Sequence, residues 1–482
     1  MKRQHVLYAL VAVMGAALFW LTFQGTELRS DGGSRTISIA IGTQDTTTNT
    51  AGAGVVIREL HLLERHLPHT GKYADVKYNI QWQNFTSGPP ITNGMMANTL
   101  QIGAMGDYPL LVNGYTFAQS RKSRSQLIAI AAYNLYGSGN GILVNKASPY
   151  YSLNDLAGKS VSVPFGSAAH GMVLHALEHA DLPADFIHLV NQAPEVGSTN
   201  LQERKIDAHA DFVPYPELFP FRGFARKIFD GAQIGLPTFH GVVVRTDFAE
   251  QYPEIIDAYL QALLEANAWI RQNPQRAAEQ IARWTGINRE VVYLYLGPSG
   301  IMVLDPTIKP SLVSAAWEDV KTLQALGRVK EFDVRRWVND AYLRKTFASN
   351  NLNYGQAVRS IANYVVTGQD DTCHVPVSDP TTAGEIWPEN GHIKPYSSAR
   401  CLLQAIGTMT AKGKKIDTAY LLDHARGTKM FAANAFYVQT KDAQFVPFLL
   451  RADAEAFSRD GGGAVMDYGA ALASVSKRSA AL

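Results

Sequence analysis

The sequence predicts an α/β fold, and two observations lead to this class. Alternating strand patterns are followed by segments with apolar residues at helical spacing, first as TISIAIG before VVIRELHLLERHL and then as VKYNIQW before SGPPITNGMMANTL. Farther along, the polar patch TGQDD interrupts the chain, and a short strand-rich segment follows it. Strands that alternate with helices are typical of βαβ units with a mostly parallel sheet. Ligands of such sheets bind where strands end and loops enter helices.

The composition is that of a globular protein of two or three domains. The chain has 482 residues, of which 46% are hydrophobic and 18% charged. Its 44 basic side chains nearly balance 42 acidic ones. A nucleic-acid-binding surface needs basic residues gathered on one face, so this balance gives no indication of that class.

The N-terminus predicts export. Residues 1–24 contain a basic start and then an uncharged run from Val6 to Phe23. The run ends in bulky side chains rather than a small-x-small cleavage site, which favours an uncleaved membrane anchor over a cleaved signal. Residues 25–35, rich in Gly, Ser and Thr, are then expected to form a tether. This places the protein on the periplasmic side of the inner membrane.

The rest of the chain divides near residue 350. We expect a two-lobed domain over 36–350, a linker over 351–369 and a small α+β domain over 370–476. Inside the first of these, one long amphipathic helical pattern is interrupted at Asn273-Pro274. The chain has two cysteines, Cys373 and Cys401, and in an oxidising exported compartment a disulfide between them is expected.

Four segments between about 36 and 350 resemble one protein family. They are NFTSGPPITNGMMANTLQIGAMGDYP, SLNDLAGKSVSVPFGSAAHGMVLHAL, LQERKIDAHADFV and PTFHGVVVRTDFAEQYPEIIDAYL. Together they resemble the nitrate/sulfonate/taurine-type periplasmic solute-binding proteins. The resemblance implies a two-lobed periplasmic binding protein fold of type II, with a ligand cleft between the lobes and delivery of solute to an ABC importer.

Three loop-to-helix junctions are suited to close backbone approach by such a ligand: residues 43–54, 87–90 and 166–170. Each serine here can cap its helix or donate to a bound oxyanion, and convergence at one cleft favours the ligand role. With the cleft positions implied by the resemblance, the expected ligand-binding residues are Thr43, Gln44, Asp45, Ser87, Gly88, Asp107, Ser167, Ala168, His170 and Asp211.

Two acidic residues complicate a purely anionic ligand. The resemblance places Asp45 and Asp211 near the cleft, and the sequence shows no obvious arginine or lysine that balances them. A zwitterion such as an amino-sulfonate would suit both amide donors and a carboxylate, and so would a neutral or cationic nitrogen compound. The sequence does not choose between them. Asp107, in Gly-Asp-Tyr-Pro, is interpreted mainly as a turn former.

The tail resembles a second family. IKPYSSARCLLQAI, AFYVQT and FVPFLLRADAEAFSRDGGGAVMDY resemble the copper-binding NosL-like accessory proteins of nitrous oxide reductase assembly. The resemblance covers about 370–475, but the Cys-x-x-Cys-x-Met signature of that family is reduced here to Cys373-His374-Val375-Pro376-Val377. Soft ligands for copper that remain are Cys373, His374, Cys401 and Met430. A disulfide is the competing interpretation of the two cysteines.

The leading hypothesis is a membrane-tethered solute-binding component of an ABC importer for a small anionic or zwitterionic compound, without catalytic activity. The alternative is an accessory, assembly or scaffold subunit of a membrane redox complex, whose tail handles copper or docks. An enzyme of the pyrimidine-precursor type on the same fold ranks third, because the sequence shows no reactive histidine cluster. Copper in the tail is the one cofactor considered.

Overall fold

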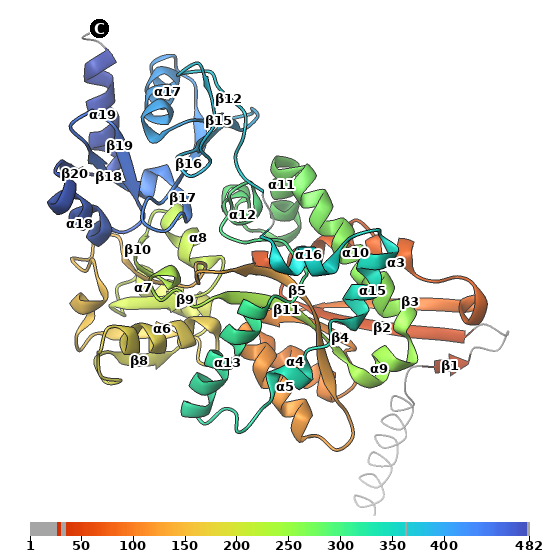
Figure 1. The fold of residues 1–482 in the computed structure, drawn as a ribbon. Coiled ribbons are helices and arrows are strands. Elements are labelled where there is room, and N and C mark those ends of the chain that lie inside the picture. The colour runs from red at the N-terminus through yellow and green to blue at the C-terminus, as the bar shows by residue number, and fades with distance from the viewer. Residues whose placement is uncertain (1–26, 30–34, 362–363, 480–482) are drawn as a thin grey trace, which may run out of the picture.

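The computed structural model describes residues 27–29, 35–361 and 364–479. These residues form two α/β lobes and a C-terminal module, which here means residues 364–479 (Figure 1). The predicted anchor over 1–24 and most of the predicted tether lie outside the described residues. Among the described helices, none is both long and apolar enough to cross a membrane.

Lobe 1 is built on a six-stranded sheet in which β2 pairs in parallel with β3 and β4, while β11 runs antiparallel between β4 and β5. Side chains of β2 alternate between two cores: Ile39 and Ile41 belong to one, and Ala40 to the other. The strands are β1 (Glu27–Arg29), β2 (Arg35–Thr43), β3 (Val76–Asn84), β4 (Ile102–Gly106), β5 (Ser125–Asn134) and β11 (Thr238–Arg245). The helices that follow the first strands are α2 (Val55–Glu59), α3 (Leu62–His66), α4 (Gly88–Met96) and α5 (Asp107–Gln119).

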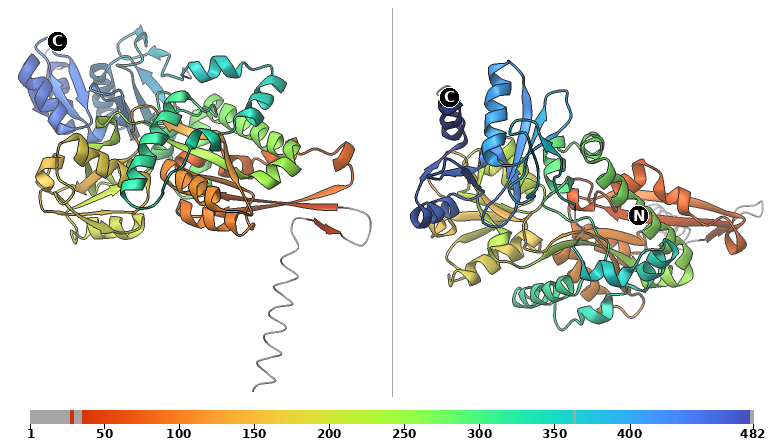
Figure 2. Two further views of the ribbon diagram at one scale, coloured as in Figure 1. Left: turned by 60° about the horizontal axis from the view of Figure 1, so that its bottom comes forward. Right: turned by 45° about the horizontal axis from the view of Figure 1, so that its top comes forward.

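Lobe 2 is a five-stranded sheet in the order β10-β6-β9-β7-β8. Its strands are β6 (Gly141–Asn145), β7 (Ser160–Val163), β8 (His188–Asn191), β9 (Ala208–Asp211) and β10 (Ala225–Asp230). Its helices are α6 (Ala168–His179), α7 (Pro194–Gln202) and α8 (Tyr215–Phe221). The lobes lie side by side in both further views (Figure 2).

The chain crosses between the lobes twice, and the crossings explain why the sheets are mixed rather than mostly parallel as expected. It leaves lobe 1 after β5 and returns from β10 into β11, so β5 pairs antiparallel with β11 and β6 with β10. The two connections touch at glycines: a Cβ on Gly231 would lie 2.2 Å from the carbonyl oxygen of Gly137. Any side chain at Gly231 would therefore push the connections apart.

The second half of lobe 1 is helical. The predicted interruption is confirmed, since α10 (Pro253–Gln272) ends directly before Asn273 and α11 (Pro274–Thr285) begins at the proline. The other helices are α9 (Thr246–Gln251), α12 (Arg289–Leu296), α13 (Pro310–Ala325), α14 (Val334–Trp337), α15 (Ala341–Ser349) and α16 (Tyr354–Arg359). Helix α16 lies within the expected linker and is packed, because the Tyr354 ring meets Phe347 at 5.3 Å between centroids.

The C-terminal module is α+β, with two main antiparallel sheets of four and three strands. The strand-rich tail expected from the sequence is confirmed: FYVQ, FVPF and AVM are strands, and a helix begins at RADAEAF. Its strands are β12 (Gln369–Asp370), β13 (Val375–Pro376), β14 (Gly384–Pro388), β15 (Lys394–Tyr396), β16 (Ile416–Leu422), β17 (Lys429–Phe431), β18 (Phe436–Gln439), β19 (Phe445–Phe448) and β20 (Ala464–Met466). Its helices are α17 (Ala399–Ala411), α18 (Arg451–Gly461) and α19 (Tyr468–Ser479).

Candidate functional site

A cavity of about 350 Å3 lies between the lobes. It forms where the carboxyl ends of β2, β3, β4, β7 and β8 meet the first turns of α4, α5, α6 and α7, as expected for parallel strands. The residues that line it are Gln44, Thr86, Ser87, Gly88, Pro89, Gly106, Pro109, Pro164, Phe165, Gly166, Ser167, Ala168, Asn191, Ala193, Pro194, Phe212 and His240.

The N-terminus of α4 has a serine hydroxyl without a capping hydrogen bond and a glycine without a side chain. Ser87 occupies the N-cap position, yet its side chain makes no capping hydrogen bond, so the oxygen is available to a ligand. Gly88 is required by packing, because a Cβ there would lie 2.2 Å from the Cβ of Pro109. Pro89 and Pro90 have no N–H, so this helix mouth offers fewer amide donors than its position at the cleft suggests.

The mouth of α6 is organised differently. The Ser167 Oγ accepts a hydrogen bond from the His170 N–H at 3.3 Å, so this serine caps its helix while its own O–H can donate to a ligand. His170 is 4% exposed and stacks on the Phe165 ring, with centroids 4.5 Å apart. Its Nδ1 accepts from the Gly166 N–H. His170 therefore positions the turn and does not itself line the cavity.

Gln44 is the buried polar residue best placed for a ligand. It is 4% exposed, lines the cavity, and its Oε1 has no hydrogen-bond partner within the described part of the chain. Buried polar atoms are nearly always paired, so an unpaired one at a cavity indicates a missing partner. A ligand or a water in the cavity would supply it.

Asp45 is not available as a counter-charge, which corrects the expectation from sequence. Arg58, on the following helix, places Nη1 2.7 Å from Asp45 Oδ2, and the Thr43 hydroxyl donates to Oδ1 at 2.7 Å. Although burial opposes its charge, hydrogen bonds to Asp45 and Glu59 raise the pKa of Arg58. Thr43 and Asp45 thus hold the loop after β2 in place and do not line the cavity.

Asp107 and Asp211 do not line the cavity either. Asp107 begins α5, and its Oδ2 accepts from the Thr238 hydroxyl at 2.7 Å, which ties the helix to β11. Asp211 is fully buried, and its Oδ2 pairs with His209 Nε2 at 2.9 Å. Burial raises the pKa of both carboxyls. Both are internal structural groups.

His240 lines the cavity, and the sequence interpretation missed it. It lies on β11, is 5% exposed, and its Nδ1 is 3.1 Å from Asn49 Nδ2. Because an amide nitrogen only donates, Nδ1 is the unprotonated nitrogen and Nε2 carries the hydrogen. Nε2 is the ring atom that faces the Gly106 backbone, where a Cβ would lie 3.3 Å away. Burial lowers the pKa of His240 to about 3, so the ring stays a neutral donor.

The cavity as a whole is neutral and mostly apolar. Its polar groups are the hydroxyls of Thr86, Ser87 and Ser167, the amides of Gln44 and Asn191, the His240 ring and backbone N–H groups. The other side chains are prolines, alanines and two phenylalanines. Of the expected ligand-binding residues, Gln44, Ser87, Gly88, Ser167 and Ala168 line the cavity, whereas Thr43, Asp45, Asp107, His170 and Asp211 do not.

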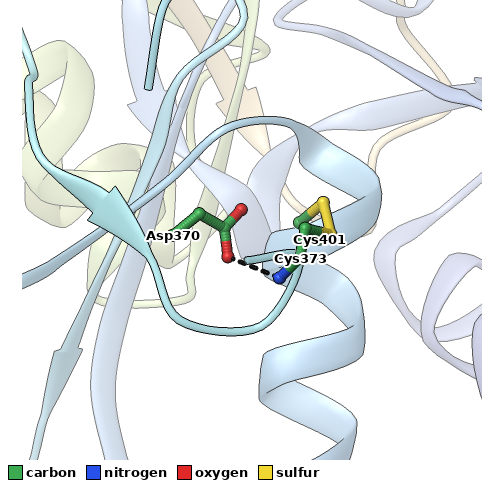
Figure 3. A group of neighbouring side chains, drawn as sticks. All are labelled: Asp370, Cys373 and Cys401. Atoms are coloured by element: carbon green, nitrogen blue, oxygen red, sulfur yellow. Dashed lines mark hydrogen bonds between the residues drawn. A yellow bond between two sulfur atoms is a disulfide. The ribbon is translucent and has the colours of Figure 1, made fainter. Parts of the chain in front are cut away.

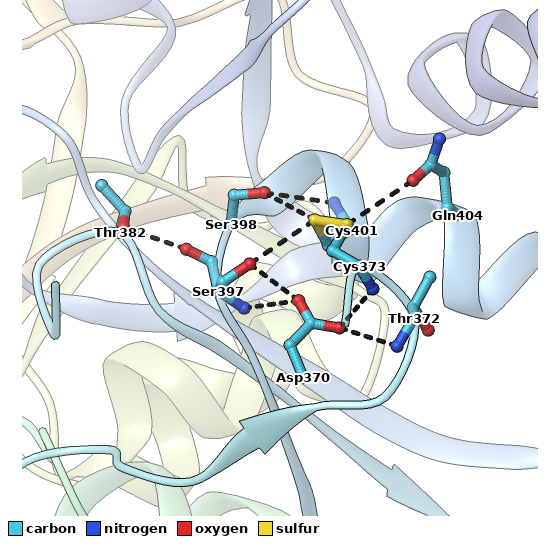
Figure 4. The surroundings of a disulfide bond; sticks show 8 residues. All are labelled: Asp370, Thr372, Cys373, Thr382, Ser397, Ser398, Cys401 and Gln404. Atoms are coloured by element: carbon cyan, nitrogen blue, oxygen red, sulfur yellow. Dashed lines mark hydrogen bonds between the residues drawn. A yellow bond between two sulfur atoms is a disulfide. The ribbon is translucent and has the colours of Figure 1, made fainter. Parts of the chain in front are cut away.

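The two cysteines form the expected disulfide, with Cα atoms 5.9 Å apart (Figure 4). Cys401 lies in the first turn of α17, which Ser398 caps, and Asp370 accepts from the Cys373 N–H at 3.0 Å (Figure 3). Asp370, Cys373 and Cys401 are the only described acidic, histidine or cysteine residues whose ligand atoms gather as a metal site would require.

The copper set expected from the sequence is not assembled in this oxidised state. A disulfide leaves neither sulfur as a thiolate, and thiolates are the ligands that Cu(I) prefers. His374 is exposed and outside the gathered group, while Met430 is buried in the core of the module. Copper binding by the tail stays a prediction for the reduced protein.

Comparisons with known proteins give matches in the two-lobed part of the chain. Residues 114–277 match the family described as NMT1/THI5 like. The taurine-binding periplasmic protein of Escherichia coli (strain K12) is 28% identical over 219 residues, 43% of this chain and 64% of that protein. This chain therefore spans slightly less than two thirds of that relative. The sequence resemblance to the taurine and sulfonate-binding proteins is confirmed, while the NosL-like resemblance of the tail stays a prediction.

Solved structures show the same fold. The periplasmic aliphatic sulphonate binding protein of Escherichia coli has a TM-score of 0.52 at 23% identity, covering 64% of this chain and 99% of its own. The periplasmic nitrate-binding protein of Synechocystis PCC 6803 has a TM-score of 0.50 at 14% identity, covering 67% of this chain and 91% of its own. The two-lobed binding-protein fold expected from the sequence is therefore confirmed.

Proposed function

We propose that this chain, whose residues 114–277 match the NMT1/THI5-like family, is the solute-binding component of an ABC importer. It takes a small organic sulfonate into the cavity between its lobes and presents it to a permease. Relatives described as taurine-binding and as aliphatic sulphonate-binding support both the class of protein and the class of ligand. We further propose that it binds without catalysis and acts on the periplasmic side, tethered through residues 1–24.

The neutral, mostly apolar lining is the observation that carries this proposal. A sulfonate bears its single charge on three oxygens, which can accept from the Ser87, Ser167 and His240 donors together. Two helix N-termini add positive dipole ends. The prolines and the Phe165 and Phe212 rings then suit an alkyl or aryl substituent.

The same lining favours a plain sulfonate over a zwitterion. Asp45 already pairs with Arg58 and Asp211 with His209, so neither carboxylate is free to meet an ammonium group. An ammonium enclosed without a counter-charge is strongly disfavoured. We therefore expect alkanesulfonates to bind better than taurine.

The experiment is a thermal-shift and calorimetric series on the full chain. The ligands are methane-, butane- and hexanesulfonate, with taurine and nitrate as comparisons. We expect the melting temperature to rise with the alkanesulfonates and more with the longer chains, and to rise less with taurine. If no ligand in this series stabilises the protein at millimolar concentration, the proposal is wrong and the accessory-subunit alternative gains ground.

A further inference from the structure

The C-terminal module contacts lobe 2 through helix α18 and strand β17. The Arg451 guanidinium, at the start of α18, lies 4.5 Å from the Tyr151 ring centroid of lobe 2. The Phe431 ring meets the Phe221 ring of α8 at 4.9 Å between centroids. Figure 1 shows this part of the module lying over lobe 2, and both views of Figure 2 agree.

The same module also contacts helices α11 and α12 on the helical side of lobe 1. Arg289, on α12, places Nη2 2.6 Å from Asp417 Oδ2, and its guanidinium lies 4.8 Å from the Trp387 ring centroid. On α11, Gln275 donates to the Gly391 carbonyl at 3.0 Å. Helix α12 packs on residues 48–50 of lobe 1 and also meets α8 of lobe 2, where the Tyr295 hydroxyl donates to Glu217.

A buried ion pair fixes the module to this helical side. Lys429 is 2% exposed, and its Nζ lies 2.6 Å from Glu385 Oε2 and 2.7 Å from the Pro298 carbonyl oxygen. Glu385 Oε1 accepts from the Tyr293 hydroxyl of α12 at 2.6 Å. Each charge here has hydrogen-bond partners, and separating the pair would leave a buried charge without compensation. The contact is therefore expected to persist in the folded protein.

The module also reaches the pivot between the lobes. Ser138 lies in the first connection between them, and its hydroxyl is 2.8 Å from the Thr428 hydroxyl of the module. Ser138 also donates to Asp230, at the end of β10, beside the second connection. Hinge motions are absorbed by a few residues in such connections, so a contact at this point bears directly on the motion.

We propose that the C-terminal module is a brace across the hinge, which restrains the rotation of lobe 2 on lobe 1. The module contacts lobe 2, the helical side of lobe 1 and the connection between them. A rotation of the lobes must therefore break contacts at one end of the module. The buried pair at Lys429 holds the helical side. The half-buried Arg451–Tyr151 contact, the Phe431–Phe221 contact and the Thr428–Ser138 contact are therefore the ones that a rotation of lobe 2 would break.

The test is hydrogen–deuterium exchange on the ligand-free full chain, which does not depend on the ligand proposed above. The variant is Arg451→Ala with Thr428→Val, which loosens the contacts to lobe 2 and to the connection. Arg344→Ala is a matched control: Arg344 also pairs with a carboxylate four residues away and also lies 4.5 Å from a tyrosine ring centroid, but both partners lie on the lobe 1 side.

We expect amides of residues 135–140 and 231–237 to exchange roughly threefold or more faster in the double variant, with α10 unchanged. The control should leave exchange in both connections as in the wild type. If the double variant also leaves the connections unchanged while its melting temperature equals that of the wild type, the module is an appended domain and the brace is wrong.

Discussion

The cavity between the lobes and the interface beneath the C-terminal module treat buried polar groups in opposite ways. At the cavity, Gln44 Oε1 has no partner in the described part of the chain, and the Ser87 hydroxyl makes no cap. At the module, the buried Lys429 is paired with Glu385 and with a carbonyl oxygen. A surface that exchanges a ligand leaves hydrogen-bond donors and acceptors without partners in the chain. A permanent interface pairs its buried donors and acceptors with each other.

The cavity and the module interface also differ in the charge of the residues that form them. Neutral residues alone line the cavity, where His240 is kept uncharged by burial. The module interface instead buries a lysine–glutamate pair and adds the Arg289–Asp417 pair at its edge. Removing a charged group from the interface should therefore lower the free energy of unfolding. Removing a polar group from the cavity should mainly weaken ligand binding.

The largest expected effect is at the interface. Lys429→Met leaves the Glu385 carboxylate buried without its cation, and we expect the free energy of unfolding to fall by about 3–5 kcal/mol. Urea denaturation of the full chain measures this. A second variant that also carries Glu385→Gln removes the stranded charge and should recover most of the loss. Equal losses in both variants would show that packing, and not the charge, is what matters.

The disulfide should come next. It closes a loop with a sequence separation of 28 residues, and opening it should cost about 3–4 kcal/mol in the chain-entropy model. Denaturation with and without a reductant checks this, and the Cys373→Ala/Cys401→Ala variant should show no further effect of the reductant. Titration of the reduced protein with Cu(I) tests the copper prediction, and lack of binding would end it.

At the cavity, His240 should leave a signature in the pH dependence of stability. Its pKa falls from 6.5 unfolded to about 3 folded, so the fold favours the neutral ring. The stability it contributes is complete above pH 6.5 and is lost as the pH falls toward 3, by about 2 kcal/mol at pH 5. His240→Gln should remove this slope, measured by denaturation at pH 8 and pH 5. The exposed His179→Gln should not, and a matching change there would contradict the assignment.

The smallest effects should separate the two serines. Ser167→Ala removes a capping acceptor and should lower ligand-free stability by about 1 kcal/mol. Ser87→Ala removes no cap and should leave the ligand-free melting temperature unchanged. Both should weaken sulfonate binding by about 1.5–3 kcal/mol, the cost of one hydrogen bond to a charged group. Calorimetry and melting curves of both variants decide it, and a stability loss in Ser87→Ala would restore the capping interpretation.

The sequence alone determined most of the elements and predicted two of the loop-to-helix junctions that line the cavity. Residue periodicity located the strands whose carboxyl ends meet at the cavity. Asn273-Pro274 marked the break between α10 and α11, because proline cannot continue a helix. Ser87, Gly88, Ser167 and Ala168 were expected at the cavity because they lie at loop-to-helix junctions and because the family resemblance places both junctions at one cleft. The disulfide followed from two cysteines and an oxidising compartment.

Only the tertiary structure decided which polar groups are already engaged. Asp45 and Asp211 resembled ligand counter-charges until Arg58 and His209 were seen to pair with them. His240 joins the cavity from β11, far along the chain from the loops that meet there, so no local pattern marks it. A hydrogen bond depends on the distance between atoms and not on their separation in sequence, and the partner of a buried polar group is therefore fixed only when the chain has folded.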